Sequence, residues 1–396
     1  MCRFFHYFSY FIQQITINIP PKTFVFKSLS NILSAETSTT GKDLFMKHKL
    51  ILIGCGGMAK NHASRFESLE DCMEVAAVVD IDLAKAQAVS DLLPNHPPAF
   101  TDYHDALEYG DLVLQVLPHH LHAQVTIDCL NAGKHVLAEK PLANTKAECL
   151  AMMEAAKRNN RVLMTAYCMR FHPALLEMKR LIQEKVYGEC FQLSIWTEQM
   201  TIKEDAPWIH DRKLLGGGQL FSHGCHYIDL MLWMMGKPIR GTHSGTNLCT
   251  PWMDREGTSN VCLEFENGAL GYHFGTWGAR GTRMGYSFHA HCEKGLIDYK
   301  LQENKLLLRG NIAEHVPGTP EDCKEYVLMD FTNSPTKHTA AEMRHFIECV
   351  ENNTTPETSP EQSLAGLEVI WELYAAEDEH RMADFSNINM DAFTGK

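Results

Sequence analysis

The hydrophobic positions in the first part of the chain form short continuous runs separated by longer amphipathic stretches. Such runs predict buried strands, because a strand that is covered on both faces is apolar throughout. The stretches between them have the length and apolar spacing of helices. Alternation of strands with helices is typical of an α/β fold with a doubly wound parallel sheet. The predicted strands are residues 50–53, 75–79, 111–116, 136–138 and 161–167, and the predicted helices are residues 84–92, 123–132 and 146–159.

The pattern changes after residue 167, where polar and apolar positions alternate in short segments. Alternation predicts strands with one exposed face, and Asn267-Gly268 between two of them indicates a hairpin turn. We therefore predict a second, α+β domain with a large, mostly antiparallel open sheet. Its expected strands are residues 191–196, 261–265, 271–274, 287–292, 295–299 and 305–308, and its expected helices are residues 175–184, 222–235, 338–351 and 361–379.

The N-terminal segment differs from both domains. It is aromatic and apolar at first, ends in a Ser/Thr/Gly-rich stretch, and precedes a methionine, Met46, that leads directly into the first strand. We expect residues 1–45 to be disordered or a misassigned extension. The predicted domains are then residues 46–166 and residues 167–392.

Composition narrows the class of protein. A net charge of -13 and the lack of any Lys/Arg-rich run argue against a nucleic-acid partner, which needs a clustered basic face. No apolar run reaches the ~20 residues of a membrane span. The 13 cysteines contain no C-x-x-C pair, which favours reduced thiols in a cytoplasmic protein over disulfides or structural zinc.

The first strand leads into a glycine-rich turn, Gly54-Cys55-Gly56-Gly57-Met58-Ala59, and then a helix. In a G-x-G-x-x-A turn the glycines allow a tight bend and close approach of a pyrophosphate. Asp80 ends the next strand, about 20 residues later, where an acid can bond the ribose hydroxyls of NAD. The second carboxylate, Asp82, and the lack of a neighbouring arginine favour NAD over NADP.

Two later strand ends carry candidate chemistry. Leu117-Pro118 is followed by His119, His120 and His122, whose spacing crosses a turn and makes contact with a cofactor a better interpretation than metal binding. The strand at 136–138 ends in Glu139-Lys140-Pro141. Ligands of an open parallel sheet bind at the carboxyl ends of its strands. We therefore expect Lys140 to stand where cofactor and substrate meet.

These segments resemble the glucose–fructose oxidoreductase and inositol dehydrogenase family, also called Gfo/Idh/MocA. The resemblance rests on the glycine turn, on Leu117-Pro118 with His122, and on the run A-G-K-H-V-L-A-E-K-P at 132–141. It implies a Rossmann domain followed by a substrate domain whose open sheet commonly forms the oligomer interface, giving a homodimer or homotetramer. An R-F-x-P element at 170–173 places Arg170 near the cofactor. The expected cofactor contacts are Gly54, Cys55, Gly56, Gly57, Met58, Ala59, Asp80, Leu117, Pro118, His122, Glu139, Lys140 and Arg170.

The second chemical stretch begins with Gly216-Gly217-Gly218, which we expect to be a flexible lead into an apolar helix. On a regular helix, Ser222, His226 and Asp229 share one face. The family reads D-x-G-x-H-x-x-D here, so the resemblance makes His226 a general base, supported by Ser222 and Asp229, with a pKa near the ordinary 6.5. Ser222 stands where many sugar and polyol dehydrogenases have an aspartate, which puts a complete Lys-Asp-His relay in doubt.

Further residues are candidates for metal or substrate binding. His223 with His289 and His291 leaves a metal site open as a less favoured alternative, since no ligand set is complete. Aromatic and arginine side chains near the glycine-rich stretches suit sugars or sugar acids. Packing and turn roles are equally open for them. The expected substrate contacts are Lys140, Trp208, Arg212, His226, Trp277 and Arg283, with Arg280 and Tyr286 as further candidates.

Together these features predict an NAD-dependent oxidoreductase for a sugar, polyol or related cyclic alcohol, with Lys140 and His226 at the reacting oxygen. Two alternatives share the fold. One is an NAD-retaining, glycoside-cleaving enzyme that uses transient oxidation and elimination, which the serine at 222 makes more credible. The other is a non-catalytic sensor that binds a dinucleotide.

Overall fold

The computed structural model describes residues 47–202 and 206–394. The predicted N-terminal extension, residues 1–45, lies outside the described residues. In the part of the chain that is described, no helix combines the length and apolarity needed to cross a membrane.

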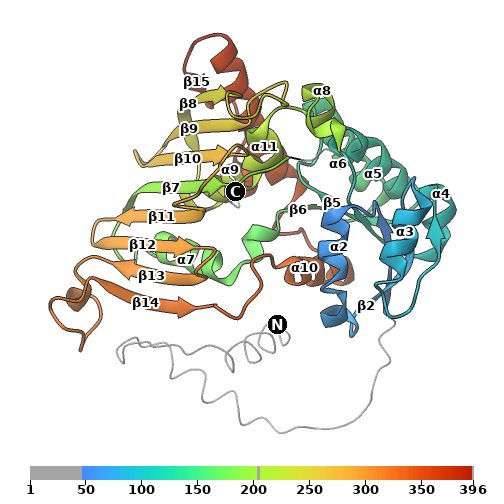
Figure 1. Ribbon diagram of the computed structural model, residues 1–396, viewed down its shortest axis with the longest axis horizontal. Coiled ribbons are helices and arrows are strands. Elements are labelled where there is room, and N and C mark those ends of the chain that lie inside the picture. The colour runs from blue at the N-terminus through green and yellow to red at the C-terminus, as the bar shows by residue number, and fades with distance from the viewer. Residues whose placement is uncertain (1–46, 203–205, 395–396) are drawn as a thin grey trace, which may run out of the picture.

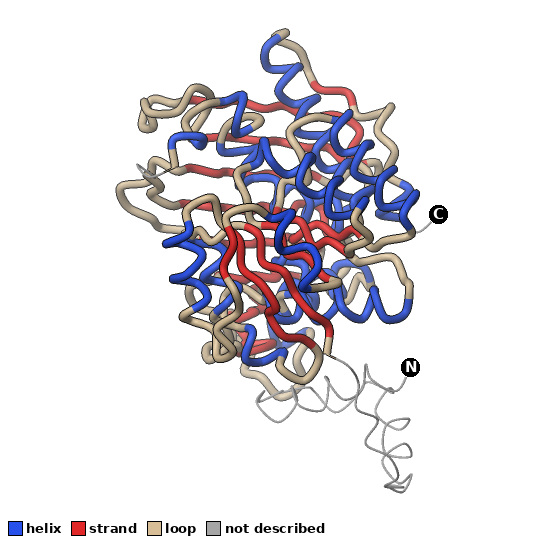
Figure 2. The backbone as a smooth tube through the Cα atoms, turned by 90° about the vertical axis from the view of Figure 1, so that its right-hand side faces the viewer, coloured by secondary structure: helices blue, strands red, loops and turns tan. Residues whose placement is uncertain are grey.

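The first domain contains a six-stranded parallel sheet in the order β3-β2-β1-β4-β5-β6. This is the strand order of a Rossmann fold, so the predicted doubly wound sheet is confirmed. Figure 2 shows these strands side by side, with helices on both faces. The strands are β1 (His48–Ile53), β2 (Met73–Val79), β3 (Ala99–Phe100), β4 (Leu112–Gln115), β5 (His135–Glu139) and β6 (Leu163–Ala166). The helices are α2 (Gly57–Ala63), α3 (Leu83–Ser90), α4 (Tyr103–Ala106), α5 (His122–Asn131) and α6 (Lys146–Asn159).

The second sheet has nine strands in the order β14-β13-β12-β11-β7-β10-β9-β8-β15. It is mostly antiparallel, as predicted; β7 and β10 form a parallel pair. Its strands are β7 (Cys190–Glu198), β8 (Pro238–Thr246), β9 (Thr258–Phe265), β10 (Leu270–Thr276), β11 (Tyr286–Cys292), β12 (Gly295–Lys300), β13 (Lys305–Arg309), β14 (Glu325–Asp330) and β15 (Ala383–Asp384). Its helices are α7 (Pro173–Gln183), α8 (Arg212–Leu215), α9 (Cys225–Met235), α10 (Thr339–Asn352), α11 (Pro360–Asp378) and α12 (Asp391–Thr394).

In the described part of the chain, helices cover one face of the second sheet and leave the other open. α7, α9 and α11 pack along it, against β13, β7, β10 and β8 (Figure 1). On the other face of β7 and β10, Trp196 lies 5.4 Å from the rings of both Tyr272 and Phe274, and all three are partly exposed. This face is the open sheet that the sequence predicted.

Helix α10 joins the two domains, although it follows the second sheet in the sequence. Met343, Phe346 and Ile347 are at most 1% exposed and share a core with strands β1 and β2 (Figure 1). Helix α10 therefore completes the core of the Rossmann domain, although it comes after the second sheet in the sequence. The boundary near residue 166 stays a prediction.

Candidate cofactor and active site

The glycine turn lies at the carboxyl end of β1 and is held by its neighbours. The Gly54 amide donates to the carbonyl of Val79 at 2.7 Å, and its φ is +94°. A Cβ there would lie 2.0 Å from the carbonyl oxygen of Val116, so only glycine fits. A Cβ on Gly56 or Gly57 would meet nothing within 4 Å. The backbone at these two glycines therefore borders open space in which a ligand can approach it.

Asp80 contacts this turn from the end of β2. Its carboxylate accepts from the amide of Cys55 at 2.9 Å and from that of Asp82 at 3.0 Å. The Cys55 thiol is 1% exposed, and burial raises its pKa to about 12. It is therefore a packing group, and only the Cys55 backbone takes part in the turn.

His122 ties the other two strand ends together. Its Nδ1 lies 2.8 Å from the Pro141 carbonyl oxygen and its Nε2 lies 2.9 Å from that of Leu117. The side chain is completely buried, and burial lowers its pKa despite the two carbonyls. The Lys140–Pro141 peptide bond is cis. The His122 ring thus holds the Leu117-Pro118 turn against the Glu139-Lys140-Pro141 turn, and both of its nitrogens face protein atoms.

Glu139 links β5 to the helix that follows the glycine turn. Its Oε1 lies 3.0 Å from Nε2 of His62 on α2, and its Oε2 accepts from the Lys140 amide at 3.2 Å. Burial raises the pKa of Glu139, but the hydrogen bond and charge of His62 outweigh it, so the net shift is downward. The ionised carboxylate therefore fixes the distance between Lys140 and the glycine turn.

Lys140 reaches from the first domain to the second. Its Nζ donates to the backbone carbonyl of Ser222 at 3.0 Å. Ser222 lies in a π-helical turn, Leu220–Gly224, that precedes α9. Such turns are rare and often mark functional sites. At position 222, where the family resemblance would have suggested an aspartate side chain, a backbone carbonyl thus serves as the acceptor for Lys140.

His226 lies on the first turn of α9 and is 9% exposed. Its Nδ1 is buried without a hydrogen-bond partner, and its ring centroid is 5.6 Å from that of Tyr167. Burial, followed by the charges of Lys140, His223 and Lys337, holds its pKa well below 6.5. The expected ordinary pKa is therefore wrong, and the imidazole is neutral.

His223 was expected only as a metal alternative, yet it lies beside the site. Its Nε2 is 3.4 Å from the Tyr286 hydroxyl and its Nδ1 is 3.4 Å from Nε2 of Gln219. Burial and the charge of Lys140 also hold its pKa well below 6.5. His289 instead faces Asp298 at 3.4 Å. Among residues 47–202 and 206–394, no group of three or more His, Cys, Asp or Glu side chains is arranged to hold a metal.

Arg170 and Asp229 form a buried ion pair, which corrects two expectations. The Arg170 Nε donates to one carboxylate oxygen of Asp229 at 2.7 Å, and Nη2 donates to the other at 2.5 Å. Both side chains are 1% exposed. The remaining nitrogen, Nη1, donates to the Glu357 carbonyl at 2.7 Å and to Oε1 of Gln362 at 2.6 Å. The described hydrogen bonds of this pair therefore run within the fold, and the Asp229 carboxylate is taken up by Arg170 instead of His226.

The π-helical turn also changes the expected placement of Ser222 relative to His226. One turn of this kind takes up an additional residue, which shifts the phase of the helix between Ser222 and the residues of α9. Positions at i, i+4 and i+7 then no longer share one face. The phase of Ser222 relative to His226 is therefore shifted, whereas His226 and Asp229 both lie on the regular helix α9, where Arg170 takes up the Asp229 carboxylate.

The predicted substrate contacts in the second domain differ in how far they are buried. Trp208 is half-buried, and its ring centroid lies 4.8 Å from that of His119. Burial, followed by the charges of His122 and Lys140, holds the pKa of His119 well below 6.5. Arg212 and Arg283 are exposed. Trp277 is 5% exposed and packs in a small core with Ile209, Leu215 and Met253, which corrects its assignment to the substrate.

Sequence reasoning also missed Lys337, which precedes α10. Its Nζ lies 3.7 Å from the sulfur of Met58, the residue that follows the glycines of the turn. No local pattern marks this lysine, because α10 returns to the first domain from more than 270 positions further along the chain.

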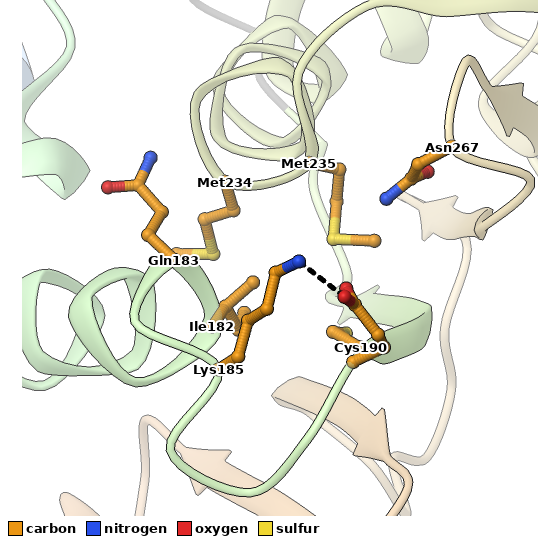
Figure 3. Close-up of a pocket in the computed structure, with 8 residues that line it drawn as sticks. Ile182, Gln183, Lys185, Cys190, Met234, Met235 and Asn267 are labelled. Carbon is orange, nitrogen blue, oxygen red and sulfur yellow. Dashed lines mark hydrogen bonds and ion pairs between the residues drawn. The ribbon is translucent and has the colours of Figure 1, made fainter.

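Two cavities in the described part of the chain lie away from these residues. One, of about 150 Å³, is lined by Cys190, Met234 and Met235, near the end of α9 (Figure 3). The other, of about 540 Å³, lies between α6 and the loop before α11. Neither is lined by a predicted site residue.

Comparison with known proteins agrees with this architecture. Residues 48–167 match the model of an oxidoreductase family with an NAD-binding Rossmann fold, and residues 175–298 match the C-terminal domain model of the same family. The class is thus that of two-domain proteins with an NAD-binding Rossmann domain. The chain belongs to the Gfo/Idh/MocA family, which confirms the resemblance found in the sequence.

Similar proteins include inositol 2-dehydrogenase 2 of Saccharopolyspora erythraea, which is 32% identical over 55% of this chain and 63% of its own length. Levoglucosan dehydrogenase of Pseudarthrobacter phenanthrenivorans is 26% identical over 63% of this chain and 73% of its own. The match thus spans under two thirds of the inositol enzyme.

Solved structures show the same fold. Levoglucosan dehydrogenase in complex with NADH has a TM-score of 0.75 at 20% identity, and the match covers 87% of this chain and all of its own. Aldose-aldose oxidoreductase from Caulobacter crescentus, complexed with glycerol, has a TM-score of 0.73 at 23% identity, covering 85% of this chain and 99% of its own.

Proposed function

We propose that this chain is an NAD-dependent oxidoreductase that transfers a hydride between the nicotinamide and a CH–OH carbon of a sugar, polyol or related cyclic alcohol. The observation that carries the proposal is the position of Lys140. It follows β5 directly and is linked through Glu139 and His62 to the glycine turn. Its amine reaches the carbonyl of Ser222, four positions before His226. The dehydrogenase names of the similar proteins support the same class.

The residues present fit a dinucleotide. The open space at Gly56 and Gly57 admits a pyrophosphate to the backbone, and Asp80 stands at the turn with carboxylate oxygens suited to ribose hydroxyls. Asp80 and Asp82 together would repel a 2′-phosphate, which favours NAD over NADP. When bound, NAD supplies the site that accepts or donates the hydride.

The chain's own residues act on the hydroxyl proton. The Lys140 ammonium donates a hydrogen bond to the substrate oxygen and stabilises negative charge as it develops there. The neutral imidazole of His226 has an unpartnered nitrogen, Nδ1, and can accept a proton. The Ser222 carbonyl holds the Lys140 amine at 3.0 Å, so the amine has a fixed position beside the substrate.

The experiment is a screen of sugars, polyols, sugar acids and glycosides with NAD and with NADP, following both reduced cofactor and released sugar. The proposal predicts net NADH from at least one alcohol. Release of sugar from a glycoside without net NADH would instead establish the elimination reaction, for which Ser222 in place of an aspartate is the supporting observation.

We also propose a cytoplasmic homodimer or homotetramer that buries the open face of the second sheet. The patch of Trp196, Tyr272 and Phe274 supports a second copy as its occupant, and the described cysteines are all free thiols. Sedimentation should show a dimer or tetramer that Trp196→Glu dissociates; a monomer in the unaltered protein would contradict the assembly.

A further inference from the structure

The three glycines before the catalytic helix are closely packed, which corrects the expectation of a flexible lead. Gly216 has a φ of +90°, and a Cβ there would lie 2.5 Å from Oδ1 of Asn144. A Cβ on Gly217 would lie 2.9 Å from the Tyr374 ring. A Cβ on Gly218 would lie 2.2 Å from Oε2 of Glu256. The glycines are therefore required by close neighbours, two of which are Tyr374 and Glu256.

Glu256 satisfies two amides at the start of the helix. The Gln219 amide donates to the Glu256 carbonyl at 2.8 Å, and the Leu220 amide donates to its Oε1 at 2.9 Å. The first amides of a helix have no partner within the helix and are usually capped by a nearby side chain. Glycines at 216–218 offer no such side chain. Glu256, which lies 36 positions away and precedes β9, takes that role.

Tyr374, on α11, satisfies two more amides. Its hydroxyl accepts from Gly218 at 3.0 Å and from Phe221 at 3.3 Å, and donates to Oε1 of Glu256 at 2.7 Å. All four backbone amides from Gly218 to Phe221 thus donate to two residues, three to their side chains and one to the Glu256 carbonyl, and the two side chains are hydrogen-bonded to each other. We call this pair, Glu256 and Tyr374, the distal cap.

The distal cap is buried and carries charge. Glu256 is 4% exposed and Tyr374 is 6% exposed. Arg255 covers the pair, with its Nε 3.5 Å from Oε2 of Glu256 and its guanidinium carbon 3.8 Å from the Tyr374 ring centroid. Burial raises the pKa of Glu256 to about 7. Its Oε2 makes no hydrogen bond, so a proton can sit there while Oε1 keeps both of its donors.

The capped turn supports the site directly. The Ser222 amide, next in sequence, donates to the Gly218 carbonyl at 3.0 Å, and the Ser222 carbonyl accepts the amine of Lys140. A shift of this turn therefore moves the acceptor of Lys140. A misplacement of about 1 Å can cost roughly a hundredfold in rate.

We propose that Glu256 and Tyr374 are positioning residues, which set the place of the Ser222 carbonyl and thereby that of the Lys140 amine. The inference rests on the proposed function for its catalytic consequence. The part of the inference that concerns the placement of Lys140 is independent of the proposed function, because that placement can be measured without turnover.

The test compares Glu256→Ala with Glu256→Gln, which keeps an oxygen able to accept from Leu220 and Tyr374. A matched control is Leu367→Ala, a fully buried side chain on α11, the helix of Tyr374, that does not belong to the cap. Each variant is assayed for kcat, KM, NAD affinity, hydrogen exchange of the 216–224 segment and the rate of acylation of Lys140.

We expect Glu256→Ala to lower kcat about thirtyfold to a hundredfold, with NAD affinity within about twofold. Hydrogen exchange at 216–224 and acylation of Lys140 should rise, with Lys157 on α6 as the internal reference. Glu256→Gln should retain kcat within about threefold, because it keeps the hydrogen-bond geometry of the cap although it removes the carboxylate charge. Leu367→Ala should lower the Tm, because it leaves a cavity in the core, with kcat unchanged at temperatures where the variant is folded.

An unchanged kcat and Lys140 acylation rate in Glu256→Ala would overturn the inference, as would equal losses in Glu256→Ala and Glu256→Gln. If Glu256→Ala does not fold, Tyr374→Phe gives the same readouts, since it removes the acceptor of Gly218 and Phe221. If the protein shows no turnover on any substrate, only the proposed function is contradicted, because the rate of Lys140 acylation still tests the distal cap.

Discussion

Replacing Asp229 by asparagine tests whether its pair with Arg170 belongs to the fold or to the reaction. The change leaves the Arg170 charge buried without its counter-ion, and it places an amide N–H₂ opposite a guanidinium N–H. Removing one partner of a buried ion pair costs about 3–5 kcal/mol. For a domain of this size each kcal/mol lowers the Tm by roughly 2 °C, so we expect a fall of roughly 6–10 °C.

The assay is thermal and denaturant unfolding, together with NAD affinity and kcat measured where the variant is folded. The control is Glu184→Gln, the same carboxylate-to-amide change at an exposed pair with Arg180, which should cost less than about 1 kcal/mol. The double variant Arg170→Met/Asp229→Leu should recover most of the lost stability, because apolar replacements of a buried pair are often neutral.

The structural reasoning would be refuted if Asp229→Asn were as stable as the unaltered protein and yet lost NAD binding or turnover. That result would return Arg170 and Asp229 to the cofactor and catalytic roles that their sequence positions suggested.

Two further predictions concern pH and cofactor choice. Because burial holds the pKa of His226 well below 6.5, the imidazole stays neutral as pH falls below that value, so the acid limb of kcat/KM for alcohol oxidation should lie below pH 6.5. A limb at or above pH 6.5 would contradict the neutral base. Asp80→Ser should weaken NAD binding about tenfold or more, because a charged hydrogen bond to the ribose is lost, and strengthen NADP binding, because a charge that repels the 2′-phosphate is lost. Titration of both cofactors checks this prediction. An unchanged ratio of NAD affinity to NADP affinity would exclude Asp80 from the ribose site.

The features that were predictable are local in the sequence. The glycine turn, Asp80 and Lys140 each stand at the end of a strand that its own apolar run reveals, and the parallel sheet then brings these ends to one edge. β8 was missed, because its polar, exposed positions leave too few apolar residues to mark a strand. β14 was also missed, although residues 326–329 form an apolar run.

The features that were not predictable depend on distant partners or on a change of helical phase. Arg170 meets Asp229 across 59 positions, and Tyr374 caps Gly218 across 156. No periodicity within a segment encodes such contacts. The π-helical turn at Leu220–Gly224 also looks like ordinary helix in sequence, so the placement of Ser222 relative to the residues of α9 could be learned only from the structure.

The most direct test of the account is Lys140→Ala, assayed beside Lys157→Ala, an exposed lysine of α6, on an alcohol substrate found in the screen. The account predicts that Lys140→Ala loses essentially all turnover while its NAD affinity stays within about threefold, since the lysine stabilises charge on the substrate oxygen. Lys157→Ala should match the unaltered protein. Normal turnover by Lys140→Ala would contradict the central claim.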